Sequence, residues 1–259
     1  MNREALIQQF NQQQRIEIDF PGFRREMDGT VIRHVSLTEE DGFISYSRLE
    51  DEMADEAIRT QLDYFQQLGQ RFEWKVYDYD QPADLKERLQ SFGFSVGEPE
   101  ALMVMELAKE HPLLAASLPD YVHRIDSEAG IDDIIALEEA VWGEPHGSLG
   151  ERLKRDLKND PDHLYLYAVY EGKKAVSAAW MYLHKGTSFA SLWGGSTLPD
   201  YRQKGLYTSL IAARAQDAWN RGYRFLTVDA SPMSRPILEK KGFTCLGYSY
   251  PCVSPPIEL

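Results

Sequence analysis

Two stretches of the chain predict the same order of elements, and this repetition constrains the fold more than any other feature of the sequence. Residues 57–107 and residues 208–250 each predict a long helix, a strand, a short helix and a strand. Both long helices end at a glycine, Gly69 or Gly222, where a left-handed C-cap favours glycine. The sequence therefore predicts two copies of one mixed α/β unit.

Further strands and helices are expected ahead of each series. In the second half, apolar and aromatic runs separated by turn-like segments predict a meander of three strands, preceded by a strand and two helices. In the first half, two strands are expected in the same place. The expected strands are 30–37, 42–49, 121–126, 163–172, 175–184 and 188–196, and the two helices are 131–142 and 149–160.

The boundary between the copies is expected in residues 107–121, where Pro112 and Pro119 interrupt the periodicity. We predict a first domain over residues 1–118 and a second over residues 119–259. Two copies in one chain can replace a homodimer, which favours a monomer.

Composition excludes several classes of protein. Residues 1–120 hold 12 basic and 24 acidic residues, so the chain lacks the clustered cations that nucleic-acid binding requires. No apolar run approaches the roughly 20 residues of a membrane helix, and the charged, glutamine-rich start is unlike a secretory signal. The two cysteines, Cys245 and Cys252, have no metal-ligand spacing. We expect a cytoplasmic protein that binds neither nucleic acid nor membrane and holds no metal.

A cationic, glycine-containing segment stands directly before the long helix of the second half. Helix N-termini bind oxyanions through unpaired amides, and Arg202, Lys204 and Gly205 strengthen such a site for a diphosphate. The patterns of a Walker loop and of a dinucleotide fingerprint are both missing. When Gly222 is placed on Gly69, residues 202–207 (RQKGLY) align with residues 49–54 (LEDEMA), whose carboxylates would repel a diphosphate. Only the second half is therefore expected to bind such a ligand.

These residues resemble the acetyl-CoA core of the GNAT N-acetyltransferases, whose motif is [R/Q]-x-x-G-x-[G/A]. The resemblance covers about residues 121–250 and includes Pro199, Tyr201, Leu210, Asp229 and the segment LEKKGF. Tyr207 departs from it, because the family usually has a small residue there. The resemblance implies two tandem GNAT-like acyl-CoA N-acyltransferase folds of mixed α/β (α+β) class. Each would be a mixed, mainly antiparallel twisted sheet flanked by helices, and the N-terminal copy would be degenerate.

The resemblance also implies where acetyl-CoA binds. Its pantetheine arm would lie between two splayed strands, with the Gly195 amide at the thioester carbonyl, Thr197 at the pantetheine amides and the amides after Arg202 at the diphosphate. The expected cofactor-binding residues are Gly195, Thr197, Leu198, Arg202, Gln203, Lys204, Gly205, Leu206, Tyr207, Thr208 and Ser234.

The catalytic groups are harder to place. Many family members have a tyrosine four residues before the Gly-Phe pair, and others have a base on the fourth strand. Here these positions are Leu238 and, near the second, Ser191 or Trp193. Tyr248 and Asp229 are the catalytic candidates, although Tyr248 fits packing on an aromatic strand and Asp229 fits a helix cap.

The expected substrate-binding residues are Trp142, Glu144, His146 and Trp193. Trp180 is a further candidate for the same pocket, although core packing also accounts for the tryptophans and solvation for His146.

Two functions remain open from the sequence. The first is an N-acetyltransferase that moves an acetyl group from acetyl-CoA to a primary amine of a small molecule or an amino terminus, by direct attack in a ternary complex. The acidic first half would favour a cationic amine. The alternative is a non-catalytic sensor or scaffold protein that binds acetyl-CoA or CoA, which the replacement of the usual tyrosine by Leu238 permits.

Overall fold

The computed structural model describes residues 2–38 and 40–257 and divides the chain into two compact units. The first unit comprises the described residues of Met1–Met103 and Asp229–Leu259, and the second comprises Val104–Val228. Two strands, β6 (Glu100–Glu106) and β11 (Phe225–Ala230), cross the division. None of the described helices is both long enough and apolar enough to span a membrane.

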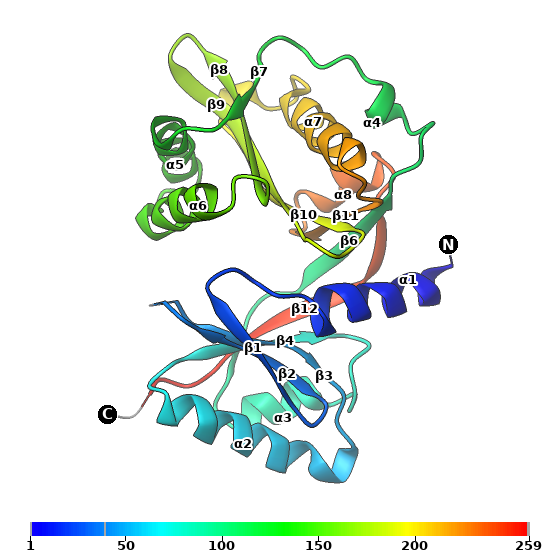
Figure 1. The fold of residues 1–259 in the computed structure, drawn as a ribbon, viewed down its shortest axis with the longest axis vertical. Coiled ribbons are helices and arrows are strands. Elements are labelled where there is room, and N and C mark those ends of the chain that lie inside the picture. The colour runs from blue at the N-terminus through cyan, green and yellow to red at the C-terminus, as the bar shows by residue number, and fades with distance from the viewer. Residues whose placement is uncertain (1, 39, 258–259) are drawn as a thin grey trace. The chain divides into compact units, whose positions relative to one another are not determined.

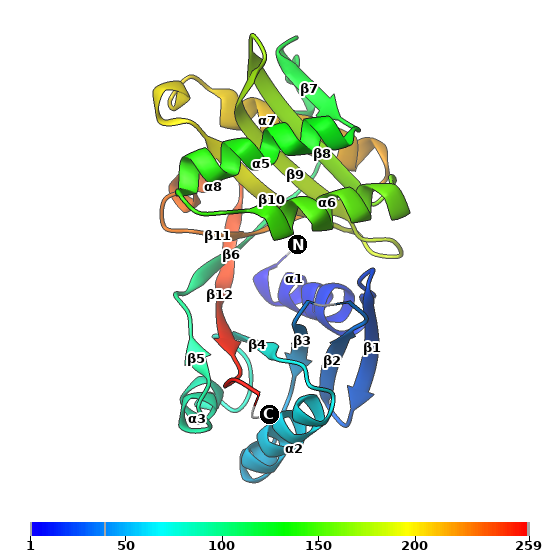
Figure 2. The ribbon, with the colours of Figure 1, turned by 90° about the vertical axis from the view of Figure 1, so that its left-hand side faces the viewer.

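The second unit is a sheet with helices on both faces (Figures 1 and 2). Its strands lie in the order β11-β10-β9-β8-β7, and all neighbouring pairs are antiparallel except β10 with β11. The helices α5 and α6 cover one face, and α7 covers the other. The bounds are α4 (Pro112–Ala115), β7 (Val122–Ile125), α5 (Glu128–Trp142), α6 (Gly147–Asn159), β8 (Leu164–Glu171), β9 (Lys174–Leu183), β10 (Phe189–Thr197), η3 (Pro199–Tyr201) and α7 (Leu206–Asn220).

The first unit has the same plan with a different final strand. Its strands lie in the order β1-β2-β3-β4-β12, and β5 pairs with β12. The helices α2 and α3 pack their apolar side chains on one face of the sheet, and α1 lies on the other (Figure 1). The bounds are α1 (Arg3–Phe10), η1 (Asn11–Ile16), β1 (Phe23–Asp28), β2 (Val31–Ser36), β3 (Gly42–Ser47), η2 (Asp51–Met53), α2 (Ala54–Gln67), β4 (Phe72–Tyr77), α3 (Leu85–Ser91), β5 (Ser95–Val96), α8 (Arg235–Glu239) and β12 (Thr244–Val253).

The final strands of the two predicted copies are exchanged. β12, which ends the second copy, pairs antiparallel with β4 from Ser249↔Tyr77 to Val253↔Glu73. β6, which ends the first copy, neighbours β11, and the Leu107 amide donates to the Arg224 carbonyl at 2.7 Å. The compact units therefore divide the chain differently from the predicted copies, 1–118 and 119–259, and those copies stay a prediction about the repeat.

Most predicted elements are confirmed. The cap glycines Gly69 and Gly222 have φ of 65° and 93°, as the left-handed cap requires. The strand β1 was missed because its sequence, FRREMD, is charged and mostly solvent-accessible, so it carries no apolar alternation.

Candidate functional site

Strands β10 and β11 separate halfway along their length. They pair in parallel only at Phe189↔Phe225, Ala190↔Leu226 and Ser191↔Thr227. Beyond Ser191, β10 continues to pair with β9, so the β11 side of its last six residues is left without a strand partner in this unit. The resemblance to the GNAT family implied this splay, and the strand register shows it, because the pairing of β10 with β11 stops at Ser191. The main chain of Leu192–Thr197 is thus available to an extended ligand that lies beside β10 as a strand would.

A β-bulge shapes the open part of β10. The register with β9 shifts between Gly194 and Ser196, so Gly195 has no opposite residue. Gly194 and Gly195 have φ of 66° and 101°, which disfavours any side chain there. A Cβ on Gly195 would lie 2.7 Å from the Tyr207 ring. The phenol that departs from the family motif therefore packs directly on the Gly195 backbone.

The segment before α7 presents a row of unpaired amides. Gln203 and Gly205 have φ of 62° and 82°, and no side chain caps the helix. Among the described residues, none accepts a hydrogen bond from the backbone amides of 203–208. The exposed side chains of Arg202 and Lys204 flank this row, with the Arg202 Nε donating to the Thr197 carbonyl at 3.1 Å and the Lys204 Nζ 4.7 Å from the Tyr201 ring centre. Amides, helix dipole and two cations together suit a diphosphate.

A buried arginine supports the bulge from the α7 side. Arg214 is 1% exposed, and its Nη1 donates to the carbonyls of Trp180 and Trp193 at 3.1 and 3.3 Å. Its Nη2 has no partner among the described residues, and burial lowers its pKa. Burial raises the pKa of Tyr207, and the Arg214 charge opposes this effect. The Trp180 ring lies beside Gly194, and its indole N–H is another buried donor without a described partner.

A buried carboxylate faces the bulge from the α5 side. Glu138 is 3% exposed, and its Oε2 accepts hydrogen bonds from the Ser196 hydroxyl at 2.7 Å and from the Trp142 indole N–H at 2.9 Å. The indole N–H also lies 3.1 Å from the Ser196 Oγ. Burial raises the pKa of Glu138. The sequence analysis missed Glu138. Its spacing from Ile131 and Ile134 places it on the apolar face of an amphipathic helix, and only the fold brings it to Ser196.

Trp193 lies on the same face of the sheet as Glu138. Its ring meets Tyr182, whose hydroxyl donates to Asp156 of α6, and its indole N–H donates to the Ser191 hydroxyl at 2.9 Å. The Ser191 Oγ lies 2.7 Å from the Nε2 of His184, whose pKa burial lowers to about 3. His184 is therefore a neutral imidazole that reaches the strand position where family members carry a base.

The two loop candidates lie between α5 and α6 and are more accessible. Glu144 is exposed, and its carbonyl lies 2.8 Å from the His146 Nδ1. The His146 amide donates to Glu139 at 3.0 Å. Their backbone geometry closes the α5–α6 loop, and neither side chain contacts Glu138 or Trp193 through a described hydrogen bond.

Three predicted site residues belong to the first compact unit, where each has local partners. The Asp229 carboxylate accepts from the Lys75 ammonium at 2.5 Å, and it does not cap α8. The Tyr248 hydroxyl accepts a hydrogen bond from Arg235, and the Ser234 hydroxyl donates to the Ser231 carbonyl at 3.3 Å. The Asp229 carboxylate is thus committed to an ion pair, which fits a structural role for this residue.

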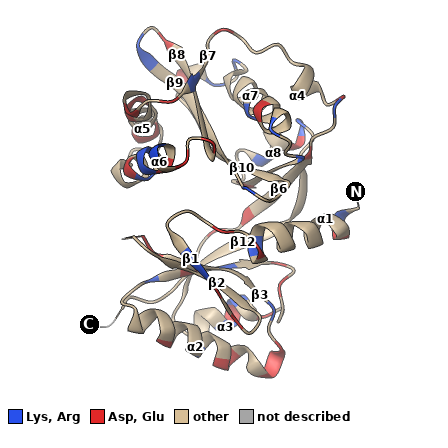
Figure 3. Cartoon of the chain, in the orientation of Figure 1, with Lys and Arg blue, Asp and Glu red and all other residues tan. Residues whose placement is uncertain are grey.

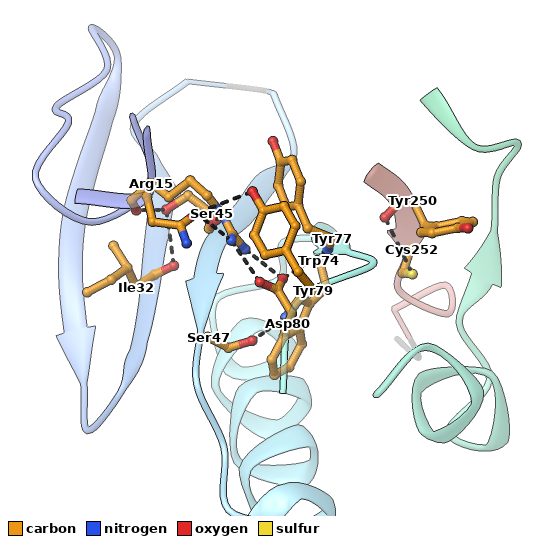
Figure 4. Close-up of polar contacts among 11 residues, drawn as sticks. Arg15, Ile32, Ser45, Ser47, Trp74, Tyr77, Tyr79, Asp80, Tyr250 and Cys252 are labelled. Atoms are coloured by element: carbon orange, nitrogen blue, oxygen red, sulfur yellow. Dashed lines mark hydrogen bonds and ion pairs between the residues drawn. The ribbon is translucent and has the colours of Figure 1, made fainter. Parts of the chain in front are cut away.

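The corresponding place in the first unit is closed. β3 and β4 pair in parallel at Gly42↔Phe72, Phe43↔Glu73 and Ile44↔Trp74 and then separate, as β10 and β11 do. Figure 4 shows that Arg15, from η1, occupies the gap: its Nε donates to the Ser45 carbonyl at 2.8 Å, and its two Nη atoms bind Asp80 at 2.8 and 2.7 Å. Beyond it, the Leu49 amide donates to the Gln81 carbonyl at 3.2 Å.

The helix that follows this closed gap starts with acidic residues (Figure 3). Asp51 and Glu52 lie in η2, and Asp55 and Glu56 lie in the first turn of α2. Arg88 of α3 binds Asp51 and also Asp55, the latter at 3.2 Å. The cation at this helix start is therefore already neutralised by the protein's own carboxylates.

Comparison with known proteins agrees with this geometry. Residues 131–243 match the acetyltransferase (GNAT) family. This segment is a GNAT acetyltransferase domain. None of the curated proteins matches the sequence.

Solved structures extend the likeness in fold to the whole chain. A GCN5-related N-acetyltransferase from Kribbella flavida is similar over 98% of this chain and 94% of its own, with 14% identity and a TM-score of 0.65. A functionally unknown conserved protein from Staphylococcus epidermidis matches over 95% and 96%, with 14% identity and a TM-score of 0.63. A tandem GNAT protein from the clavulanic acid biosynthesis pathway matches over 92% and 85%, with 10% identity and a TM-score of 0.59. The predicted fold class, two GNAT-like α/β folds in tandem, is confirmed.

Proposed function

We propose that this GNAT protein is an N-acetyltransferase that moves the acetyl group of acetyl-CoA directly to a primary amine of a small molecule or an amino terminus. The observation that carries the proposal is the splay of β10 from β11 beside six consecutive amides, 203–208, that have no described acceptor. The diphosphate of acetyl-CoA binds these amides, with Arg202 and Lys204 adding charge. The pantetheine arm lies along Leu192–Thr197, as a strand would.

The buried polar atoms without partners fit this ligand. The Arg214 Nη2 and the Trp180 Nε1 belong to residues that contact the Trp193–Gly194 segment. Unpaired buried groups are costly unless a ligand or water satisfies them. Gly194 and Gly195 let the Trp180 and Tyr207 rings lie directly against the β10 backbone, because any Cβ there would meet a ring within 3 Å.

The reaction then requires little from side chains. The neutral amine attacks the thioester carbon, the Gly195 amide stabilises the oxyanion, and the carbon–sulfur bond breaks to release the CoA thiolate. The amine loses one proton in the process, and the thiolate or solvent takes up one proton. A thiol with an ordinary pKa of about 8.5 is a good leaving group, so a strong acid at the sulfur is not essential.

We propose that the first copy binds no acetyl-CoA. Arg15 and Asp80 fill the gap between β3 and β4, and carboxylates stand at the start of α2. A diphosphate there would meet negative charge in place of free amides.

Charge reversal at the two helix starts tests this assignment. Acetyl-CoA should raise the melting temperature of the wild type by several degrees, because it binds only the native state. Arg202→Glu should abolish that shift, and the matched reversal Glu50→Arg in the first copy should leave it unchanged. An equal loss in both variants would refute the division between the copies. Differential scanning fluorimetry gives the shift, and release of free thiol with a panel of amines gives the activity.

The alternative, a CoA-binding sensor or scaffold, is favoured by two contacts. Lys75 holds Asp229 and Arg235 holds Tyr248, so neither catalytic candidate is free of a cation. A thermal shift with CoA, combined with no thiol release for any amine, would establish this alternative.

A further inference from the structure

The acceptor side of the GNAT domain has a candidate binding site of its own, and the identity of its ligand as an acceptor rests on the proposed function. On that side the sheet carries Trp193 and Ser196 on β10, and α5 supplies Glu138 and Trp142. Trp142 and Trp193 are 55% and 46% exposed, which is unusual for such large aromatic side chains. Trp142 contacts Glu138, a carboxylate that is almost entirely buried.

One carboxylate oxygen of Glu138 accepts hydrogen bonds and the other does not. Its Oε2 accepts from Ser196 and Trp142, whereas its Oε1 is buried without a hydrogen-bond partner among the described residues. No lysine or arginine among the described residues forms an ion pair with it within 4.0 Å, and His146, whose charge opposes the rise of the Glu138 pKa, forms no described hydrogen bond with it. A buried carboxylate without a cation is costly, and a ligand cation is the partner that satisfies it best.

The surroundings also favour a cation. Glu138 lies in the last turns of α5, where the helix dipole is negative, and Glu144 stands nearby in the sequence. The faces of tryptophan rings attract ammonium groups. Ser196 follows Gly195 directly, so an ammonium at Glu138 stands next to the position assigned to the thioester.

We propose that Glu138 is the anionic centre of a binding site for the primary ammonium group of the acceptor, with Trp142 and Trp193 contacting its apolar body. Trp142 covers the site when no amine is bound: its indole N–H binds Glu138, and it ends α5 just before Gly143, which has φ of 76°. Entry of an amine moves the Trp142 ring and brings the ammonium to the free Oε1, and the ammonium gives up one proton to solvent before the neutral amine attacks the thioester.

The test measures amine binding in the full chain without acetyl-CoA, so it does not depend on turnover. Phenethylammonium is titrated against tryptophan fluorescence, and 2-phenylethanol serves as the neutral probe of the same shape. The Trp142→Phe variant identifies the part of the signal that comes from Trp142. Glu138→Gln keeps an acceptor for Ser196 and Trp142 and removes only the charge. Glu139→Gln, one residue along on the exposed side of α5, is the matched control.

We expect the wild type and Glu139→Gln to bind the ammonium probe alike and Glu138→Gln to bind it at least about 10-fold more weakly. 2-Phenylethanol should bind weakly, and with the same affinity to the wild type and to Glu138→Gln. Equal affinity of wild type and Glu138→Gln overturns the proposal, and so does the absence of any Glu138-dependent signal for phenethylammonium or 1,4-diaminobutane into the millimolar range.

Two further measurements separate the possible failures. Glu138→Gln should keep the melting temperature and its rise with acetyl-CoA, which shows that the fold and the donor site are intact. If acetyl-CoA fails to stabilise the wild type while ammonium binding still depends on Glu138, the proposed function is wrong and the cation site stands. If acetyl-CoA binds and Glu138 is without effect on the amine, the cation site is wrong and the proposed function stands.

Discussion

At the scale of single residues, Gly195 combines two constraints that can be separated. Its φ of 101° disfavours a side chain, and a Cβ would lie 2.7 Å from the Tyr207 ring. Gly195→Ala should lower the free energy of unfolding by about 1–3 kcal/mol and should weaken acetyl-CoA binding. Gly172→Ala, where φ is 60° and no atom lies within 4 Å, should show the strain alone.

The contribution of the ring follows from a second substitution. If the ring contact matters, adding Tyr207→Ala to the Gly195→Ala variant should recover part of the stability that Gly195→Ala loses. Urea unfolding of Gly195→Ala, Tyr207→Ala and the double variant measures this. A double variant that is no more stable than Gly195→Ala would contradict the contact.

A second prediction at this scale concerns pH. The pKa of His184 is lowered to about 3 in the fold, compared with about 6.5 in an unfolded chain. Between these values the unfolded state binds one more proton, so stability falls as the pH falls, by about 1.4 kcal/mol per pH unit from this residue. His184→Asn should reduce that slope between pH 6 and 4 without changing the slope above pH 7. Unfolding curves across this range check it, and an unchanged slope would show that His184 is protonated in the fold.

At the scale of secondary structure, local signals predicted most elements and the contacts between distant segments were missed. The meander strands, the caps at Gly69 and Gly222 and the amide-rich start of α7 follow from periodicity, glycine and charge, which are properties of short stretches. Glu138 gains its role from Ser196, 58 residues away, and Arg15 from Asp80, 65 residues away. No local pattern records such pairs, because the fold decides which side chains meet.

The π-helix η1 provides the clearest case, because it places Arg15 in the gap of the first copy. Arg15 is 2% exposed, and the Cζ atom of its guanidinium lies 4.2 Å from the centre of the Tyr77 ring. Arg15→Ala leaves the Asp80 carboxylate buried without its partner, so it should lower the free energy of unfolding by about 3–5 kcal/mol. The double variant Arg15→Met, Asp80→Leu removes both charges and should be much less destabilised. Denaturant unfolding measures both, and equal losses would show that packing, and not the ion pair, holds this segment.

At the scale of the whole molecule, strand exchange ties the two predicted copies together. β12 completes the sheet that contains β4, and β6 neighbours β11, so each copy supplies the final strand of the other's sheet. Residues 119–259 expressed alone would lack β6 and expose a β11 edge, which is a template for aggregation. We therefore expect this fragment to be insoluble or poorly folded by itself.

The same exchange predicts that a cut between the copies is tolerated after folding. The segment 115–118 is exposed, so a protease site inserted at Ser117 should be cleaved in the native protein. Because β12 remains paired with β4 and β6 with β11, the two pieces should elute together on size exclusion and keep the thermal shift with acetyl-CoA. Two independently eluting pieces, or a fragment 119–259 that folds and binds acetyl-CoA alone, would mean that the exchanged strands contribute little to either sheet.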